Sequence, residues 1–149
     1  MPTSSAAIAS SWLGGGVHVI WEALDIRLVT DETARALASV KQDKSLHFAW
    51  DGHSQDEAVP RGVECLKRNG IRPYRLMFYV LVGFNTTPEY DMYRIMSIHG
   101  MGANPFVMPF DKKDPYQRHL ARWCNNKRIF KTTDFDRYEP WVKERDRCR

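Results

Sequence analysis

Four short runs of apolar and aromatic residues recur along the chain, and each ends at a turn signal. They are Leu24–Leu28, Leu46–Trp50, Leu76–Val82 and Phe106–Met108. Branched and aromatic side chains in runs of this length predict β-strands. We therefore expect four strands, and Val17–Trp21 either adds a further strand or leads into the first.

Helical patterns fill the gaps between the predicted strands, and each begins with a capping signal. The predicted starts are Thr30 before Asp31 and Glu32, the S-x-x-E capping box of Ser54 and Glu57, Thr87-Pro88, and Asp114-Pro115. Short polar side chains there accept hydrogen bonds from the unpaired amides of the first turn, and proline fits that turn. Gly70 supplies a stop for the second helix, whereas Pro60 lies inside it and conflicts with its hydrogen bonding.

Apolar residues at helical spacing predict the side of each helix that packs on the sheet. The expected buried faces are Ala34, Leu37 and Ala38; Val59, Val63 and Leu66; Met92, Ile95, Met96 and His99; and Tyr116, Leu120, Trp123 and Cys124. Strand and helix alternate four times, with strand starts 22, 30 and 30 residues apart. This order is typical of right-handed β–α–β units and therefore of a parallel sheet.

The predicted fold class is α/β, a partial (β/α) barrel of about four parallel strands alternating with helices. It occupies residues 24–138, after an atypical N-terminal segment at 1–23 and before a basic tail at 139–149. Half a barrel should leave two open sheet edges, at Leu24–Leu28 and Phe106–Met108, and an exposed inner face. An isolated chain of this kind is expected to associate or to pack loosely.

Composition and local sequence argue against a disordered, a membrane-spanning or a secreted protein. Hydrophobic residues make up 43% and charged residues 27% of the chain, the balance of a folded globular domain. The longest apolar run is too short to span a bilayer, and the first residues lack the basic start of a secretory signal, so we expect a cytoplasmic protein outside the membrane. Cys65, Cys124 and Cys148 lack the close spacing of a zinc or redox motif and are expected to be free thiols.

The net charge of +4 is concentrated near the C-terminus. Segment 111–149 carries 12 Lys or Arg against 7 Asp or Glu, while the rest of the chain has 10 against 11. A basic segment of this kind either binds phosphate groups, as in nucleic acid, or forms a solvated helix face, which is the commoner outcome.

Ligands of parallel α/β sheets meet the C-terminal ends of the strands, which selects four places for candidate chemistry. Asp25 and Arg27 alternate along the first predicted strand and would share a face, where they suit a polar ligand or pair with each other. Asp51 follows the second strand and either accepts hydrogen bonds from ribose hydroxyls or caps the next helix.

The third and fourth strands end in residues that suit a flat ligand. Gly83 lets a ligand or another backbone approach closely, and Asn85 offers polar groups beside a helix N-terminus, although a plain turn explains both. Met108 and Pro109 either form an apolar shelf or simply end a core strand. The histidines are scattered, and no phosphate-binding loop, dinucleotide motif or H-E-x-x-H is present, so no catalytic residue is assigned.

Four separated segments of the chain resemble a group within the radical SAM superfamily. They are LDIRLVTDETARAL, LHFAWD, YRLMFYVLVGFNTTPEYDMYR and NPFVMPFDKKDPYQRHLARWCNNKRIFK, in that family's order, from about Leu24 to Tyr138. The resemblance implies strands three to six of the family's barrel. Members bind S-adenosylmethionine beside a 4Fe–4S cluster and cleave it to an adenosyl radical.

The resemblance also implies roles for individual residues. The expected adenosyl contacts are Asp51 at the ribose, Leu81 and Gly83 in the second half of a G-x-I-x-G-x-x-E motif that packs on adenine, and Met108 and Pro109, whose backbone would face adenine. Tyr79 and Thr86 replace the first glycine and the glutamate of that motif. Asp25, Arg27 and Asn85 complete the candidate cofactor-binding set.

The family's cluster loop, C-x-x-x-C-x-x-C, has no counterpart in this sequence. Its three thiolates hold three irons and leave the fourth open for S-adenosylmethionine. We therefore expect no metal site, at most weak S-adenosylmethionine binding, and a separate N-terminal half carrying the cysteine loop as partner. The alternatives are a non-catalytic binding or interaction module that uses the basic C-terminal segment, and a decayed gene fragment.

Overall fold

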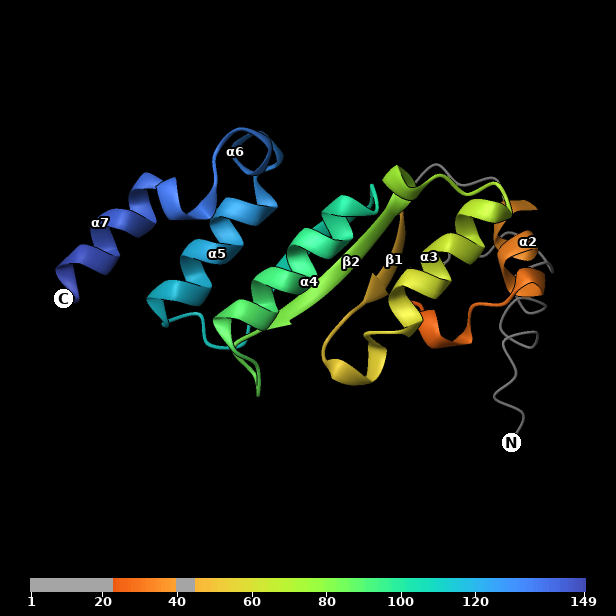
Figure 1. The fold of residues 1–149 in the computed structure, drawn as a ribbon, viewed down its shortest axis with the longest axis horizontal. Helices are drawn as coiled ribbons and strands as arrows, with labels where there is room; N and C mark the ends of the chain where they lie inside the picture. The colour runs from red at the N-terminus through yellow and green to blue at the C-terminus, as the bar shows by residue number, and fades with distance from the viewer. Residues whose placement is uncertain (1–22, 40–44) are drawn as a thin grey trace, which may run out of the picture.

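Figure 1 shows the fold in a computed structural model, which describes residues 23–39 and 45–149. The strands are β1 (Leu46–Ala49), β2 (Leu76–Val82) and β3 (Asn104–Pro109). The α-helices are α2 (Asp31–Ser39), α3 (Ala58–Arg68), α4 (Pro88–Gly100), α5 (Pro115–Asn125), α6 (Lys127–Thr132) and α7 (Glu139–Arg147). Short 3-10 turns are η1 (Ile26–Leu28), η2 (His53–Gln55), η3 (Pro73–Arg75) and η4 (Phe135–Arg137).

The strands form a parallel sheet in the order β1-β2-β3. This confirms the α/β class and three of the predicted strands. Because parallel crossovers are right-handed, a sequential strand order sets the connecting helices on the same face of the sheet. Accordingly, α4 packs against β2 and β3, and α5 packs against β3. Among the described residues the sheet has three strands instead of the expected four.

The first predicted strand, at 24–28, is wrong except at its start. Leu24 makes a single parallel bridge to Phe48, and its amide donates to the His47 carbonyl at 2.7 Å. The chain then turns into η1, because the Asp25 carboxylate accepts the Arg27 amide at 3.0 Å. Short acidic side chains compete with strand pairing in this way.

The capping signals of three helices are confirmed. Thr30 and Thr33 exchange hydrogen bonds at the start of α2, Thr87 accepts the Tyr90 amide, and Asp114 accepts the Gln117 amide. These bonds satisfy amides that have no partner within the first helical turn.

The predicted capping box of α3 is wrong, and its failure removes the conflict at Pro60. Ser54 lies inside η2, and α3 begins only at Ala58 without a side-chain cap. Pro60 is then the third residue of the helix, where its missing N–H costs nothing. Gly70 ends the helix as expected, with a φ of +93°.

The buried face of α4 differs from the one that the apolar pattern predicts. Met96 and His99 are exposed, while Asp91 and Arg94 are fully buried beside Ile95. The pattern failed because polar groups occupy the position where the helix crosses the ends of two strands. The predicted faces of α3 and α5 are confirmed, except that Tyr116 is half-buried.

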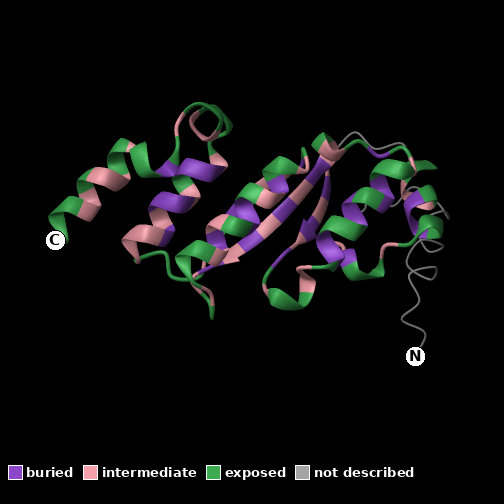
Figure 2. Cartoon of the chain, in the orientation of Figure 1, coloured by how far each residue is buried: buried purple, intermediate pink, exposed green. Residues whose placement is uncertain are grey.

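The two faces of the sheet are packed differently (Figure 2). Along β2, buried and half-buried residues alternate strictly. The buried residues Leu76, Phe78, Val80 and Val82 belong to the core with the apolar residues of α3, α4 and α5. The opposite face of β2, with Met77, Tyr79 and Leu81, is half-buried. We call it, with its neighbours His47, Ala49, Phe106 and Met108, the open face.

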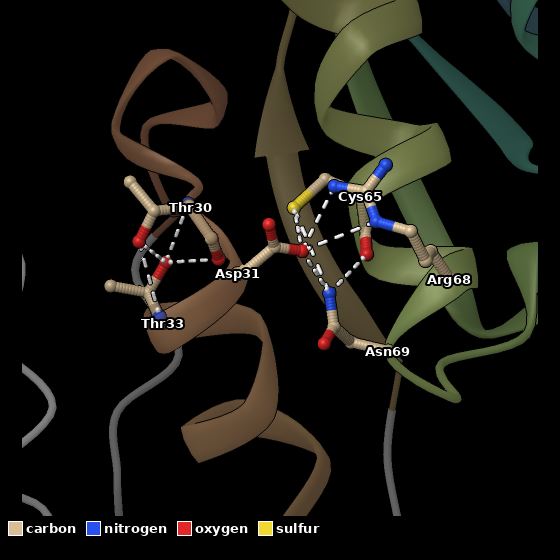
Figure 3. Close-up of polar contacts among 6 residues, drawn as sticks. All are labelled: Thr30, Asp31, Thr33, Cys65, Arg68 and Asn69. Atoms are coloured by element: carbon tan, nitrogen blue, oxygen red, sulfur yellow. Dashed lines mark hydrogen bonds and ion pairs between the residues drawn. The ribbon is translucent and has the colours of Figure 1, made fainter.

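Helix α2 is joined to the end of α3 by one carboxylate (Figure 3). Asp31 accepts hydrogen bonds from Asn69 Nδ2 at 2.7 Å and Arg68 Nη2 at 2.9 Å. These bonds, with the Asn69 contribution the larger, lower the pKa of Asp31 to about 2. The Cys65 thiol lies beside the same carboxylate, and burial together with that negative charge raises its pKa.

Aromatic side chains attach the last helices to α5. Trp141 stacks on Phe135 with ring centroids 5.5 Å apart, and Trp123 of α5 packs on Phe130 and Phe135. Segment 139–149, expected as a basic tail, therefore contains a packed helix, α7. Cys124 lies buried in α5, and burial raises the pKa of its thiol to about 12, whereas Cys148 is exposed. No helix in the described ranges is long and apolar enough to cross a membrane.

Candidate functional site

The C-terminal ends of the three strands meet at one edge of the sheet. Leu81 of β2 is paired with Met108 of β3. On the other side, the Trp50 amide donates to the Tyr79 carbonyl at 2.8 Å, so the register of β1 and β2 continues past the end of β1. Backbone pairing ends at Trp50, whose carbonyl accepts Arg94, and the next residue is Asp51, which an extension of the register would set beside Leu81. We call Asp51, Leu81 and Met108 the C-terminal row.

Leu81 and Met108 lie on the open face, as the period of two along each strand requires, and the same alternation carried past Trp50 would place Asp51 on that side. Asp51 is exposed, Leu81 is half-buried and Met108 is 45% exposed. The next row contains Tyr79, whose ring packs edge-on against Phe106 with centroids 5.7 Å apart. The open face is therefore apolar and aromatic, with a carboxylate at its C-terminal end.

The turn after β2 is shaped by a glycine in a conformation that other residues rarely adopt. Gly83 has a φ of +80°, and Asn85 has a φ of 51°. The Gly83 amide donates to Thr86 Oγ1 at 3.2 Å. A Cβ on Gly83 would stand 2.1 Å from Gln117 Nε2. The expected close approach is therefore present, but the group that approaches from this side is the chain's own Gln117.

Gln117 also connects this turn to the end of β3. Its Oε1 accepts the Asp111 amide at 2.8 Å, and its side chain is buried. Nearby, the exposed rings of Phe84 and Phe110 lie 4.8 Å apart. The exits of β2 and β3 are thus fixed to each other and carry an accessible aromatic pair.

A buried guanidinium lies beneath the ends of β1 and β2. Arg94 donates to the carbonyls of Trp50 at 2.5 Å and Leu81 at 2.8 Å, and to Asp91 Oδ1 at 2.6 Å. Arg94 and Asp91 are almost fully buried, and the bonds of the two Nη atoms offset much of the cost of burying the charge, although the buried Nε has no hydrogen-bond partner. Arg94 therefore ties together two strand ends where backbone pairing stops.

A second carboxylate organises the exit of β1. Asp56 accepts hydrogen bonds from the Trp50 indole at 3.0 Å, from His53 Nδ1 at 2.8 Å and from the Tyr90 hydroxyl. Burial opposes ionisation of Asp56, but the bonds from Tyr90, His53 and Trp50 outweigh it and lower its pKa. The phenol of Tyr90 has a raised pKa, because it is partly buried and bonded to this carboxylate. The Trp50 side chain, one residue before Asp51, is thus connected through Asp56 to His53 of η2 and Tyr90 of α4.

Asp25 and Arg27 do not belong to this arrangement. They form an ion pair with each other, with Arg27 Nη2 2.8 Å from Asp25 Oδ2. The hydrogen bond from Arg27 lowers the pKa of Asp25. The expectation of two side chains on an inner strand face is wrong here, because the segment is the 3-10 turn η1, and the ion pair is the interpretation that the structure bears out.

The structure thus pairs Leu81 with Met108, places Asp51 just past the end of β1, sets Gly83 and Asn85 in the turn after β2, and leaves Pro109 as the last residue of β3. Sequence reasoning missed Arg94, Asp91 and Gln117. Their only signal was position: each is a polar residue in the first two turns of a helix that follows a strand end. Charged residues in helices usually face solvent, so the apolar pattern assigned them to the surface.

The side chains at this edge of the sheet are better suited to binding an organic ligand than to holding a metal ion. Within the described ranges, no group of three His, Cys, Asp or Glu side chains could hold a metal ion. Cys65 and Cys124 lie buried on separate helices, α3 and α5. The described residues therefore do not fit a 4Fe–4S cluster, whereas one carboxylate beside apolar and aromatic surface suits a sugar joined to a flat ring.

Comparisons with known proteins identified no relative of this chain. A scan against protein-family models, a search of curated proteins and a search of solved structures each gave no significant match.

Proposed function

We propose that this chain is part of a radical SAM barrel and that its C-terminal row binds the adenosyl group of S-adenosylmethionine. The observation that carries the proposal is the pairing of Leu81 with Met108 at the C-terminal end of a parallel sheet, with the exposed Asp51 two residues beyond the end of β1 at the same edge. Each of these residues comes from a different segment of the resemblance. Ligands of parallel α/β sheets bind at this end.

The chemistry of the row suits such a ligand. The exposed carboxylate of Asp51 can accept hydrogen bonds from two ribose hydroxyls, and charged acceptors make the stronger bonds. Leu81 and Met108 offer apolar contact to adenine, and the backbone of Pro109 and Asn85 offers polar groups beside it. In this proposal Gly83 shapes the turn, since Gln117 occupies the space at its Cα.

The proposal assigns no reaction step to this chain. S-adenosylmethionine supplies a radical only beside a cluster, and the described residues do not fit one. A separate N-terminal half with the cysteine loop would have to bring the cluster to this edge. Without the cluster iron as an anchor for its methionine end, the ligand should bind weakly.

The alternative function, an interaction module that uses the basic segment, has a specific feature against it. Several basic side chains near the C-terminus are paired with acids of the same region: Lys143 with Glu139, Arg118 with Glu144, and Arg145 with Asp146. These pairs favour a solvated helix face. Binding of an oligonucleotide that falls steeply with salt would support the module instead.

Titration of the labelled chain with S-adenosylmethionine, followed by NMR, tests the proposal. We expect saturable shifts at the C-terminal row with a dissociation constant on the order of 1 mM, about 4 kcal/mol of binding. Asp51→Asn should weaken binding about tenfold, because it removes a charged acceptor. Asp136→Asn, a change at an exposed aspartate in η4, is the matched control. Equal binding by the two variants, or uridine binding as well as adenosine, would contradict the proposal.

A further inference from the structure

The outer edge of β3 is identified by its hydrogen bonds. The Phe110 amide donates to the Val82 carbonyl at 3.1 Å, so Phe110 faces β2. Because backbone groups alternate sides along a strand, Pro105, Val107 and Pro109 direct theirs away from β2. These three residues form the edge at which a further strand would add.

This edge has no free amide. Proline has no backbone N–H, so Pro105 and Pro109 cannot donate. The Val107 amide donates to Asn125 Oδ1 at 2.7 Å, and the Val107 carbonyl accepts from Asn125 Nδ2 at 2.9 Å. A carboxamide carries the same donor and acceptor as a peptide group, so Asn125 takes the position of a neighbouring strand.

The exposed side of β1 is occupied in a similar way. The His47 carbonyl accepts from the Leu24 amide. Beyond it, Gln55 Nε2 donates to the Ala49 carbonyl at 2.9 Å, and Gln55 Oε1 accepts the Asp51 amide at 2.8 Å. In the part of the chain that the structure describes, the sequence-based expectation of an open edge is therefore wrong at β3, while the β1 side is partly occupied.

We propose that Asn125 closes the sheet at β3, so that β3 is the last strand in any assembly that this chain enters. A partner, including a second copy, then meets the open face or the β1 side and adds no strand beyond β3. Exposed strand edges template association between chains, and closing one is a recognised means of preventing it. This inference is independent of the adenosyl proposal, because Asn125 and Val107 lie outside the C-terminal row.

Amide hydrogen exchange of the wild-type chain is the first test, and it needs no variant. We expect the Val107 amide to exchange as slowly as the Val80 amide in the central strand. An open edge would instead leave Val107 with the exchange rate of an unstructured amide, and that result would overturn the proposal.

Variants test the role of the side chain. Asn125→Ala should speed exchange of the Val107 amide about tenfold, the cost of one hydrogen bond, and should increase concentration-dependent light scattering over that of the wild type. Asn126→Ala is the matched control, since the Asn126 side chain caps α6 by accepting the Arg128 and Ile129 amides. It should destabilise a helix without opening the edge.

Asn125→Asp keeps the proposal testable if the alanine variant fails to fold. Its carboxylate still accepts the Val107 amide but offers no donor to the Val107 carbonyl. We expect Val107 to stay protected while association rises, and acidification that protonates the new carboxyl to reverse that rise. Equal scattering by wild type, Asn125→Asp and Asn126→Ala, with Val107 protected in each, would overturn the proposal.

Discussion

The two faces of β2 differ in what they contribute, although they alternate along a single strand of seven residues. The helix-covered face is fully buried and holds the core together. The open face is half-buried, aromatic, and ends in the C-terminal row. Stability and recognition are therefore carried by neighbouring residues whose side chains point in opposite directions, and substitutions should separate the two.

Replacing Phe78 should have the largest effect on stability. Phe78 is fully buried and stacks on Phe48, with ring centroids 5.4 Å apart. We expect Phe78→Ala to lower the free energy of unfolding by about 4 kcal/mol, because it leaves a cavity in the core. Urea denaturation measures the change, with Tyr79→Ala on the open face as the comparison. A loss of equal size at Tyr79 would mean that the open face is also core.

The second-largest loss of stability should follow the removal of Asp91, the buried acid beneath the strand ends. Asp91→Ala leaves Arg94 buried without its counter-charge, and we expect it to cost about 3 kcal/mol. Substituting both residues with apolar ones, Asp91→Leu with Arg94→Met, should recover much of this loss. Thermal melts of the single and double variants decide the question. A double variant that is no more stable than the single one would show that the guanidinium bonds to the strand carbonyls matter more than the charge.

A substitution at Gly83 tests the boundary between the two faces. Gly83→Ala combines a positive φ with an overlap against Gln117, and we expect it to cost about 2 kcal/mol. Adding Gln117→Ala should relieve the overlap and leave the backbone strain of about 1 kcal/mol. Chemical denaturation of both variants separates the two contributions. If the second change brings no recovery, the overlap is not the cause.

The smallest effect on stability should come from Asp31, on the outer surface of the helix layer, and it should be seen only at acidic pH. The folded-state pKa of Asp31 is lowered to about 2, so its bonds to Asn69 and Arg68 add stability above its ordinary pKa of 3.8. That contribution should be lost as the pH falls from about 4 to about 2. Asp31→Asn should flatten this part of the pH profile, as followed by thermal melts. An unchanged profile would mean that another carboxyl controls the acid transition.

Sequence patterns predicted the regular parts of this fold well. The strands at 46–49 (predicted one residue longer) and 76–82 and the caps at Thr87 and Asp114 follow local rules that a few neighbouring residues satisfy. The parallel order of these strands also followed from the alternation of strand and helix along the chain. Local chemistry and hydrophobic period agree at these places, which is why they could be predicted.

The rest depended on contacts between distant residues. Gln55, Arg94 and Asn125 all bond backbone groups at the end or edge of a strand, and their partners lie 4 to 44 positions away along the sequence. No local sequence pattern predicts that a side chain will hydrogen-bond to a strand backbone in place of a neighbouring strand. The 3-10 turn after Leu24 was missed for a related reason, since one carboxylate outweighed the strand propensity of its neighbours.

The burial of two cysteines has a practical consequence for spectroscopy. Thiol reagents attack the thiolate, and a raised pKa leaves almost none of it at Cys124 or Cys65 near neutral pH. Cys148 is exposed one residue beyond α7. A maleimide dye should therefore attach there selectively in the native chain, with no cysteine removed. The signal from that dye would report directly whether α7 stays docked when the sheet acquires a ligand or a partner.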